Sequence, residues 1–280
     1  WHCFGTCGKG GDVYTFLMEY ENLEFAEALR ILAKRTGIQL RQSDFQAGIS
    51  GKKEIIFKLN KTSMDFYHYV LIQHKAGKKA LSYLTEKRKL DVRLIETFMI
   101  GFSPKDGVDL SNYLIQKKKY KEEDLIEAGL VFYSGSRVVD FFRNRIMFPL
   151  FDHRDNVVGF SGRAIDESYS GGKYINTRDT IVYHKGSMFF GLNTAKEEIK
   201  KLDKAIIVEG ELDVISCFSI GIKNVVAVKG TALTENQVAL IGRFTNNICL
   251  CFDKDEAGFE ATKRSLQSLE KKEMNITTCI

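Results

Sequence analysis

The sequence predicts an α+β N-terminal part, made of helices with a β-hairpin region, followed by an α/β domain with a central, mostly parallel sheet. Apolar runs of strand length at 205–208 and 248–252 enclose segments with helical spacing and a further strand. Alternation of strand and helix is typical of a parallel sheet. Apolar runs at 146–151 and 156–161, on either side of the polar turn 152–155, predict an antiparallel hairpin.

The first twelve residues predict half of a zinc site. Cys3 and Cys7 lie in a glycine-rich stretch at a spacing that zinc sites use. Tetrahedral zinc needs four ligands, and His2, adjacent to Cys3, is poorly placed as a third. Another pair would have to precede residue 1, and two unliganded thiols in a glycine turn are the alternative.

Two helices are expected next. Asp12 is placed to cap a helix that runs through Tyr20, and the apolar spacing predicts a second helix over about 24–35 with Gly37 as its C-terminal stop. The inward face of the second helix would hold Phe25, Ala28, Leu29 and Leu32.

Polar residues and glycine between 43 and 55 predict a linker. Helical stretches are expected beyond it, over 63–75, 78–87 and 91–98. The basic run 117–121 is expected to be a solvated helix end, and we assign it no function.

A set of cations follows in which each member stands beside a glycine, an aromatic residue or a strand end. They are Arg143, Arg145, Arg163, Lys173 and Lys185. Cations isolated in this way suit a groove that tracks phosphates, with aromatic faces available for base stacking. A generic polar β surface would supply some of them by chance.

The remainder of the chain should alternate regularly. Helices are expected at 193–201, 212–219, 234–243 (capped by Thr234) and 256–271, and strands at 205–208, 224–228, 248–252 and 275–280. Because the carboxyl ends of parallel strands meet at one edge of a sheet, the acids that follow two of these strands should lie together.

These acids predict a metal site. Glu209 follows the first strand, Asp253 and Asp255 follow the third, and Asp213 lies one helical turn beyond Glu209. Carboxylates at one edge repel each other unless a cation joins them, and oxygen ligands alone favour a hard cation, with Mg²⁺ as the first choice. Asp213 could equally be a structural helix residue.

Composition excludes some classes of protein. The chain has 280 residues, a net charge of +5 and no apolar run near the ~20 residues needed to cross a bilayer. Nothing resembles a signal peptide, so no membrane partner is expected. Six cysteines, with Cys217, Cys249, Cys251 and Cys279 in apolar surroundings, predict reduced core thiols and a cytoplasmic location. The chain starts at Trp1 and ends within a predicted strand, so we expect a fragment.

The acidic motif resembles the Toprim domain, whose signature is a Glu-Gly pair after one strand and Asp-x-Asp after another. Here these are Glu209-Gly210 and Asp253-Lys254-Asp255, with Lys254 at the variable position. Toprim domains occur in primases, topoisomerases and nucleases, so this resemblance implies phosphoryl chemistry on nucleic acid without choosing the reaction.

A longer resemblance, to the bacterial DnaG-type DNA primases, covers nearly the whole chain. It is carried by HCFGTCGKGGD at 2–12, FRNRIMFPLFDHRDNVVGFSGR at 142–163, GKYINTRDT at 172–180, YHKG at 183–186 and KGTALT at 229–234. The last resembles the family's LGTALT, and the inserted Thr6 widens the family's Cys-x-x-Cys.

The resemblance implies the domains: the end of a zinc-binding domain (1–42), a linker (43–55), a basic subdomain (56–192) and a Toprim subdomain (193–280). It implies primer synthesis from ribonucleoside triphosphates on single-stranded DNA. Glu209, Asp253 and Asp255, with or without Asp213, would hold Mg²⁺ or Mn²⁺. Arg163, Lys173 and Lys185 would neutralise the triphosphate, and Arg88, Arg143 and Arg145 would hold the template. A helicase partner would bind outside this chain, and zinc would occupy the intact zinc-binding domain.

Two alternatives remain open at this point. One is a Toprim nuclease or topoisomerase-like enzyme. The other is a nucleic-acid-binding accessory protein with a degenerate active site, motivated by Lys254 and by the altered cysteine spacing.

Overall fold

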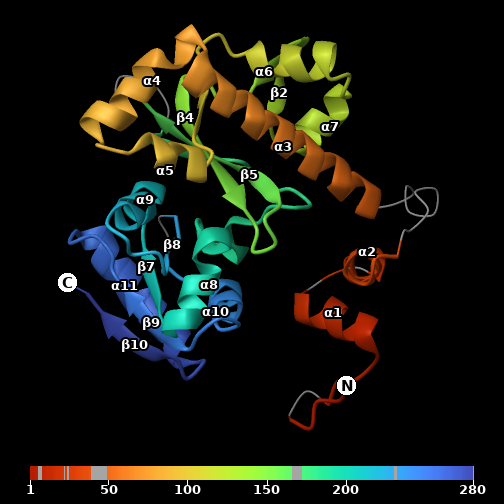
Figure 1. Cartoon of the computed structure of the whole chain (residues 1–280), viewed down its shortest axis with the longest axis vertical. Coiled ribbons are helices and arrows are strands. Elements are labelled where there is room, and N and C mark those ends of the chain that lie inside the picture. The colour runs from red at the N-terminus through yellow and green to blue at the C-terminus, as the bar shows by residue number, and fades with distance from the viewer. Residues whose placement is uncertain are drawn as a thin grey trace. The chain divides into compact units, whose positions relative to one another are not determined.

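The computed structural model describes residues 1–5, 8–21, 23, 25–38, 49–165, 172–229 and 232–279. The chain divides into two compact units, Trp1–Ile55 and Ile56–Ile280, and each is described by itself (Figure 1). Within the described ranges, no helix has the length and apolar character needed to cross a membrane.

The first unit contains the two expected helices, α1 (Val13–Glu21) and α2 (Phe25–Thr36). Both predicted end signals are confirmed: the Asp12 carboxylate accepts the Thr15 N–H at 2.8 Å, and Gly37 has a φ of +72°. Ala28 is buried as expected, but Phe25 is 54% exposed. Phe25 is the first residue of its helix and packs on the Tyr14 ring rather than into a core.

The linker prediction is wrong for residues 49–55. A long helix, α3 (Ile49–Gln73), already begins there. Tertiary contacts outweigh the local glycine and polar residues, because Lys53 pairs with Glu27 at 3.3 Å and the same helix continues into the fully buried Leu59. Residues 43–48 lie outside the described residues.

The second unit is built around an antiparallel sheet of order β1-β4-β5-β6. Its strands are β1 (Gly101–Ser103), β4 (Arg145–Phe151), β5 (Val157–Ala164) and β6 (Tyr174–Asn176). The predicted hairpin is confirmed as β4 and β5, and Asp152 accepts the N–H groups of Arg154 and Asn156 in its turn. A separate pair, β2 (Val131–Ser134) and β3 (Arg137–Asp140), lies beside it.

One local structure occurs twice in this unit, 30 residues apart, as Tyr83 and Tyr113 show. The first copy is α4 (Lys78–Ser82), the π-helical turn η3 (Tyr83–Lys87), α5 (Val92–Thr97) and β1. The second copy is α6 (Asp109–Asn112), the π-helical turn η4 (Tyr113–Lys117), α7 (Glu122–Glu127) and β2.

The agreement between the two copies extends to the backbone. Lys89 and Lys119 have φ values of 56° and 61°, and each π-helical turn ends in the same way. The Leu90 N–H donates to the Leu84 carbonyl at 3.0 Å, and the Tyr120 N–H donates to the Leu114 carbonyl at 3.1 Å. The two copies are therefore one structural unit, repeated.

The C-terminal part forms the predicted parallel sheet, of order β10-β9-β7-β8 with every neighbouring pair parallel. Its strands are β7 (Ala205–Val208), β8 (Val225–Ala227), β9 (Asn247–Leu250) and β10 (Asn275–Thr278). The connecting helices are α8 (Leu192–Leu202), α9 (Glu211–Ser219), α10 (Glu235–Ile241) and α11 (Glu256–Glu270). Thr234 caps α10 as expected.

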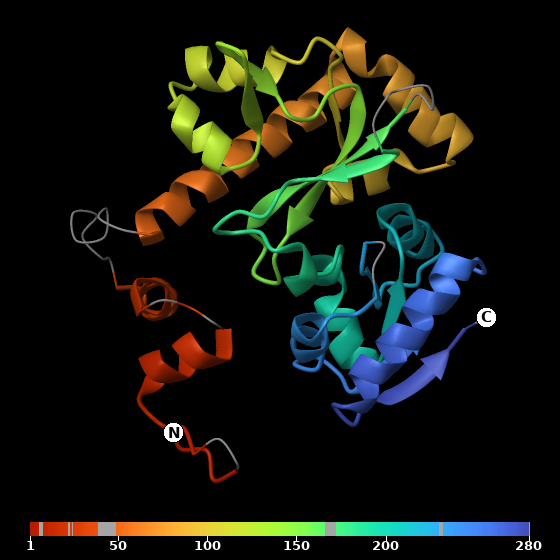
Figure 2. The same ribbon diagram turned by 180° about the vertical axis from the view of Figure 1, so that it is seen from behind.

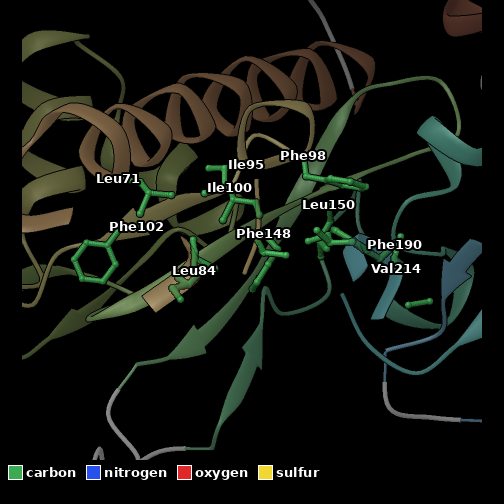
Figure 3. Packing of buried hydrophobic residues seen from close by; sticks show 14 of the residues in the cluster. Leu71, Leu84, Ile95, Phe98, Ile100, Phe102, Phe148, Leu150, Phe190 and Val214 are labelled. Carbon is green, nitrogen blue, oxygen red and sulfur yellow. The ribbon is translucent and has the colours of Figure 1, made fainter. Parts of the chain in front are cut away.

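A shared apolar cluster joins the antiparallel part to the parallel sheet (Figure 3). Phe148 on β4 and Phe98 after α5 contact Phe190, and Val214 on α9 belongs to the same cluster. Figure 2 shows the antiparallel strands (green) above the parallel sheet, whose strands run from teal (β7) to dark blue (β10). Because one core serves both parts, it fixes the position of the antiparallel part relative to the parallel sheet.

The cysteine prediction is partly wrong. Cys217, Cys249 and Cys251 are half-buried and free, whereas Cys279 is exposed and free. Cys279 follows β10, which is an edge strand of the described parallel sheet and pairs with β9 alone.

Candidate active site

The acids after β7 and β9 meet at one edge of the parallel sheet. Glu209 Oε1 accepts the Asp253 N–H at 2.9 Å. Asp255 caps α11 by accepting the Gly258 N–H at 2.7 Å. A Cβ on Gly258 would lie 2.7 Å from Glu209 Oε1 and 2.2 Å from the Asp253 carbonyl oxygen. Only glycine therefore allows α11 to approach Glu209 this closely.

Crowding of like charges shows in the ionisation of these acids. Burial raises the pKa of Glu209, and the charges of Asp253, Asp255 and Asp213 raise it further. Burial also raises the pKa of Asp213, with Asp253 and Glu211 adding to the effect. A bound cation would offset the repulsion and favour the ionised carboxylates, so the donor set fits a hard divalent ion.

Three of the carboxylates also accept backbone N–H groups: Glu209 and Asp255 as described above, and Asp213 from the Gly210 N–H at 2.9 Å. In the described ranges no three His, Cys, Asp or Glu residues are already arranged as a metal cluster. The fit to a metal therefore rests on the oxygen chemistry and on the charge of the acids.

A pocket of about 410 Å³ opens beside these acids, and cations line its other side. Glu209, Asp213 and Asp253 line it from the parallel sheet. The antiparallel part contributes Arg88, Arg163, Lys173, Tyr174, Ser161 and Asn176. We call the first set the acidic wall and the second set the basic wall.

Tyr83 organises the basic wall. Its hydroxyl accepts hydrogen bonds from Arg88 Nε, at 2.7 Å, and from Arg163. The Arg163 guanidinium also lies over the rings of Tyr83 and Tyr174, 5.0 Å and 5.7 Å from their centroids. Burial raises the pKa of Tyr174 to about 12, so this ring stays neutral beside the guanidinium. The result is a fixed cation on a wall of aromatic faces.

The structure brings together Arg88, Arg163 and Lys173 with Glu209, Asp213 and Asp253, all singled out from the sequence. Asp255 lies beside the pocket, near enough for its charge to raise the pKa of Glu209.

Three of the predicted cations are not among the residues that line this pocket. Lys185 lies near it, since its charge lowers the pKa of Lys229. Arg143 is half-buried with its guanidinium over the Phe132 ring. Arg145 is 2% exposed and donates to the backbone carbonyls of Gly162, Gly172 and Lys173, so the template contact predicted for it has no support in this geometry.

Sequence reasoning missed a buried ion pair in the same pocket. Lys229 and Glu211 both line it, 3.4 Å apart, with side chains 3% and 4% exposed. Burial lowers the pKa of Lys229 to about 8 against the opposing charge of Glu211. The available signal was Lys229 itself, which stands where the motif LGTALT has leucine. Tyr83 and Tyr174 were also missed, because sequence does not show which aromatic residues face a pocket.

The zinc half-site cannot be assembled from the described residues, because Cys7 lies outside them. Cys3 is half-buried, and its N–H donates to the Lys9 carbonyl at 2.7 Å.

Three family models match successive parts of the chain. Residues 1–47 match a CHC2 zinc finger, residues 66–196 match the N-terminal domain of the DNA primase catalytic core, and residues 206–280 match a Toprim-like domain.

Curated relatives match nearly the whole chain. The chain is 37% identical over 283 residues to a DNA primase of Staphylococcus aureus (strain COL), which is 98% of this chain and 46% of the relative. It is 36% identical over 274 residues to the DNA primase of Geobacillus stearothermophilus, covering 96% and 45%. The chain thus spans about half the length of the curated relatives it matches.

Solved structures agree. The zinc-binding and RNA polymerase domains of the Aquifex aeolicus primase match with a TM-score of 0.74 at 35% identity, covering 99% of this chain and 66% of that one. The RNA polymerase domain of Mycobacterium tuberculosis primase DnaG matches with a TM-score of 0.74 at 30% identity, covering 80% and 75%. The motifs, the fold and these matches agree, and the chain belongs to the family of DnaG-type DNA primases.

Proposed function

We propose that this chain carries the primer-synthesising centre of a DNA primase, which copies single-stranded DNA into short RNA from ribonucleoside triphosphates. One observation carries the proposal: the acidic wall and the basic wall face each other across a single pocket. The relatives are DNA primases, and one similar solved structure is a DnaG primase catalytic domain bound to ssDNA. In this proposal segment 56–192 supplies the basic wall and segment 193–280 the acidic wall.

The acidic wall would hold the metal. Its residues Glu209, Asp213 and Asp253, together with Asp255 beside the pocket, offer only oxygen donors, which favours Mg²⁺ or Mn²⁺. Divalent ions bound there would stabilise the charge that develops on the attacking 3′-hydroxyl and on the leaving pyrophosphate.

The basic wall would bind and orient the substrates. Arg163, fixed by Tyr83, and Lys173 neutralise triphosphate oxygens, and Lys185 adds charge nearby. Arg88 lies exposed at the pocket and Arg143 is half-buried over Phe132, so these two are the cations we assign to the template backbone.

Glu209→Gln tests the proposal. The change keeps the shape of the side chain and removes its charge, so primer synthesis should fall below detection while the fold and template binding persist. Labelled RNA made on single-stranded DNA with the four ribonucleotides and Mg²⁺ or Mn²⁺ is the readout. Glu197→Gln is the matched control, because Glu197 is 76% exposed and pairs with Lys200 on α8.

Three results would contradict the proposal. Wild-type primer yield from the Glu209→Gln variant would remove Glu209 from the mechanism. Metal-dependent nicking of duplex DNA without nucleotides, and no primer synthesis by the unaltered protein, would favour the nuclease alternative. Template binding with no incorporation under any divalent metal would favour the accessory protein.

The proposal also includes a zinc ion and a helicase partner. The match of residues 1–47 to a CHC2 zinc finger supports Cys3 and Cys7 as ligands of Zn²⁺. The replicative helicase would bind a region outside this chain. Zinc content per protein, measured before and after Cys3→Ser, tests the first of these assignments.

A further inference from the structure

The buried ion pair of Lys229 and Glu211 has no part in the mechanism above. Both residues line the pocket, and both side chains are more than nine-tenths buried. Buried ion pairs are weak sources of stability, because the loss of solvation offsets their attraction. A pair of this kind beside a metal-binding edge therefore calls for a functional explanation.

The pair is incompletely satisfied. The distance of 3.4 Å is longer than that of a charge-assisted hydrogen bond, about 2.7–2.9 Å. Within the described part of the chain, neither Lys229 Nζ nor Glu211 Oε1 has a hydrogen-bond partner. An ammonium group has three donors, and the Lys229 side chain that carries this one lines the pocket.

The backbone directs Lys229 to this place. Its φ of 68° lies in the left-handed region, which a lysine rarely adopts, and its N–H donates to the Glu209 carbonyl at 2.8 Å. Strained backbone that the surrounding structure maintains is concentrated at functional sites. Glu211, at the first position of α9, then lies 3.4 Å from the ammonium and holds it in place.

We propose that Lys229 is a phosphate-binding residue of this pocket, held in position by Glu211. Its ammonium would donate to a phosphate oxygen of the bound substrate, in the pocket that Arg163 and Lys173 also line. The source of that oxygen is a nucleoside triphosphate or the backbone of a nucleic-acid strand. The assignment rests on the pocket being the substrate site proposed above.

A double variant, Lys229→Met with Glu211→Gln, tests this assignment. It removes both buried charges at nearly constant volume, which avoids the unpaired buried charge that a single change would leave. The matched control is Lys196→Met with Asp155→Asn, because Lys196 and Asp155 form an ion pair at 3.0 Å and do not line the pocket.

The probes are inorganic tripolyphosphate, GTP and a single-stranded oligonucleotide, each titrated by calorimetry. Loss of one hydrogen bond from an ammonium should raise the dissociation constant of the relevant probe about tenfold. In primer synthesis the KM for nucleotides should rise by more than kcat falls. Loss for tripolyphosphate and GTP assigns the triphosphate as the source, and loss for the oligonucleotide alone assigns the strand.

Unchanged affinity for all three probes overturns the inference, even if the double variant is less stable, because that result makes the ion pair structural. Binding of tripolyphosphate needs no catalysis, so this outcome is separate from the Glu209→Gln test. If the double variant does not fold, NMR spectra of the lysine side chains in the unaltered protein decide. Tripolyphosphate or the oligonucleotide should shift the side-chain signals of Lys229 and leave those of Lys196 in place, and Lys229 signals unchanged by either probe overturn the inference.

Discussion

The two copies of the repeated unit, residues 78–103 and 108–134, have the same backbone and different surroundings. In the first, Tyr83 holds Arg88 and Arg163 at a pocket whose other side is the acidic wall. In the second, Tyr113 stacks on Phe66 of α3, 5.0 Å between ring centroids, and Lys118 lies over Tyr113 at 5.5 Å. The same tyrosine and cation thus occur in both copies, and only the first has the carboxylates of the parallel sheet opposite. The two copies therefore differ in the surface that lies opposite them, and the local backbone does not distinguish them.

The largest expected effect is common to both copies. Leu84 and Leu114 are fully buried at matching positions, so Leu84→Ala and Leu114→Ala should each lower the free energy of unfolding by about 2–5 kcal/mol. Urea denaturation followed by circular dichroism measures both. A large loss from one variant and none from the other would show that the copies are not structurally equivalent.

The cations should separate the copies. Arg88→Ala removes a charge that lines the pocket, so primer synthesis at limiting substrate should fall about tenfold, whereas Lys118→Ala should change it less than about twofold. Both residues are exposed, so stability should hardly change in either variant. Equal losses of activity would mean that the second copy also contacts substrate.

The smallest effect should come from the tyrosine hydroxyls. Tyr83→Phe keeps the ring and removes the acceptor for Arg88 and Arg163, and a net loss of about 1 kcal/mol corresponds to a KM for nucleotides raised about fivefold. Tyr113→Phe should leave the KM unchanged within error. Steady-state kinetics on the two variants sharpens the comparison, since they differ only in which copy they alter. A KM unchanged in Tyr83→Phe would mean that Tyr83 does not position Arg163.

The sequence predicted the parallel sheet well, because its strands and helices switch between two clear periodicities. β7 has the predicted bounds, and β9 ends two residues before the predicted 252. The three-residue strands β1 and β6 were not predicted, since their pairing with β4 and β5 stabilises them and no local signal does. Residues 49–55 were misassigned for a related reason, because contacts made elsewhere on α3 outweigh the local composition.

The site was predicted unevenly. The acids could be placed together because parallel strands end at one edge, and Glu209, Asp213 and Asp253 do share the pocket. The charge of Arg145 is visible in the sequence, but its burial against backbone carbonyls is not. The repeat was present in the sequence as two Tyr-Leu pairs, at 83 and 113, each followed by a basic run.

The apolar cluster of Phe98, Phe148, Phe190 and Val214 has a mechanical consequence (Figure 3). It ties the acidic wall and the basic wall to one packed interior, so the pocket between them cannot widen without exposing that interior to water. In the proposed reaction, a growing RNA–DNA hybrid would therefore have to leave the pocket without the two walls moving apart. The length of the hybrid would then not be limited by an opening motion of the two walls.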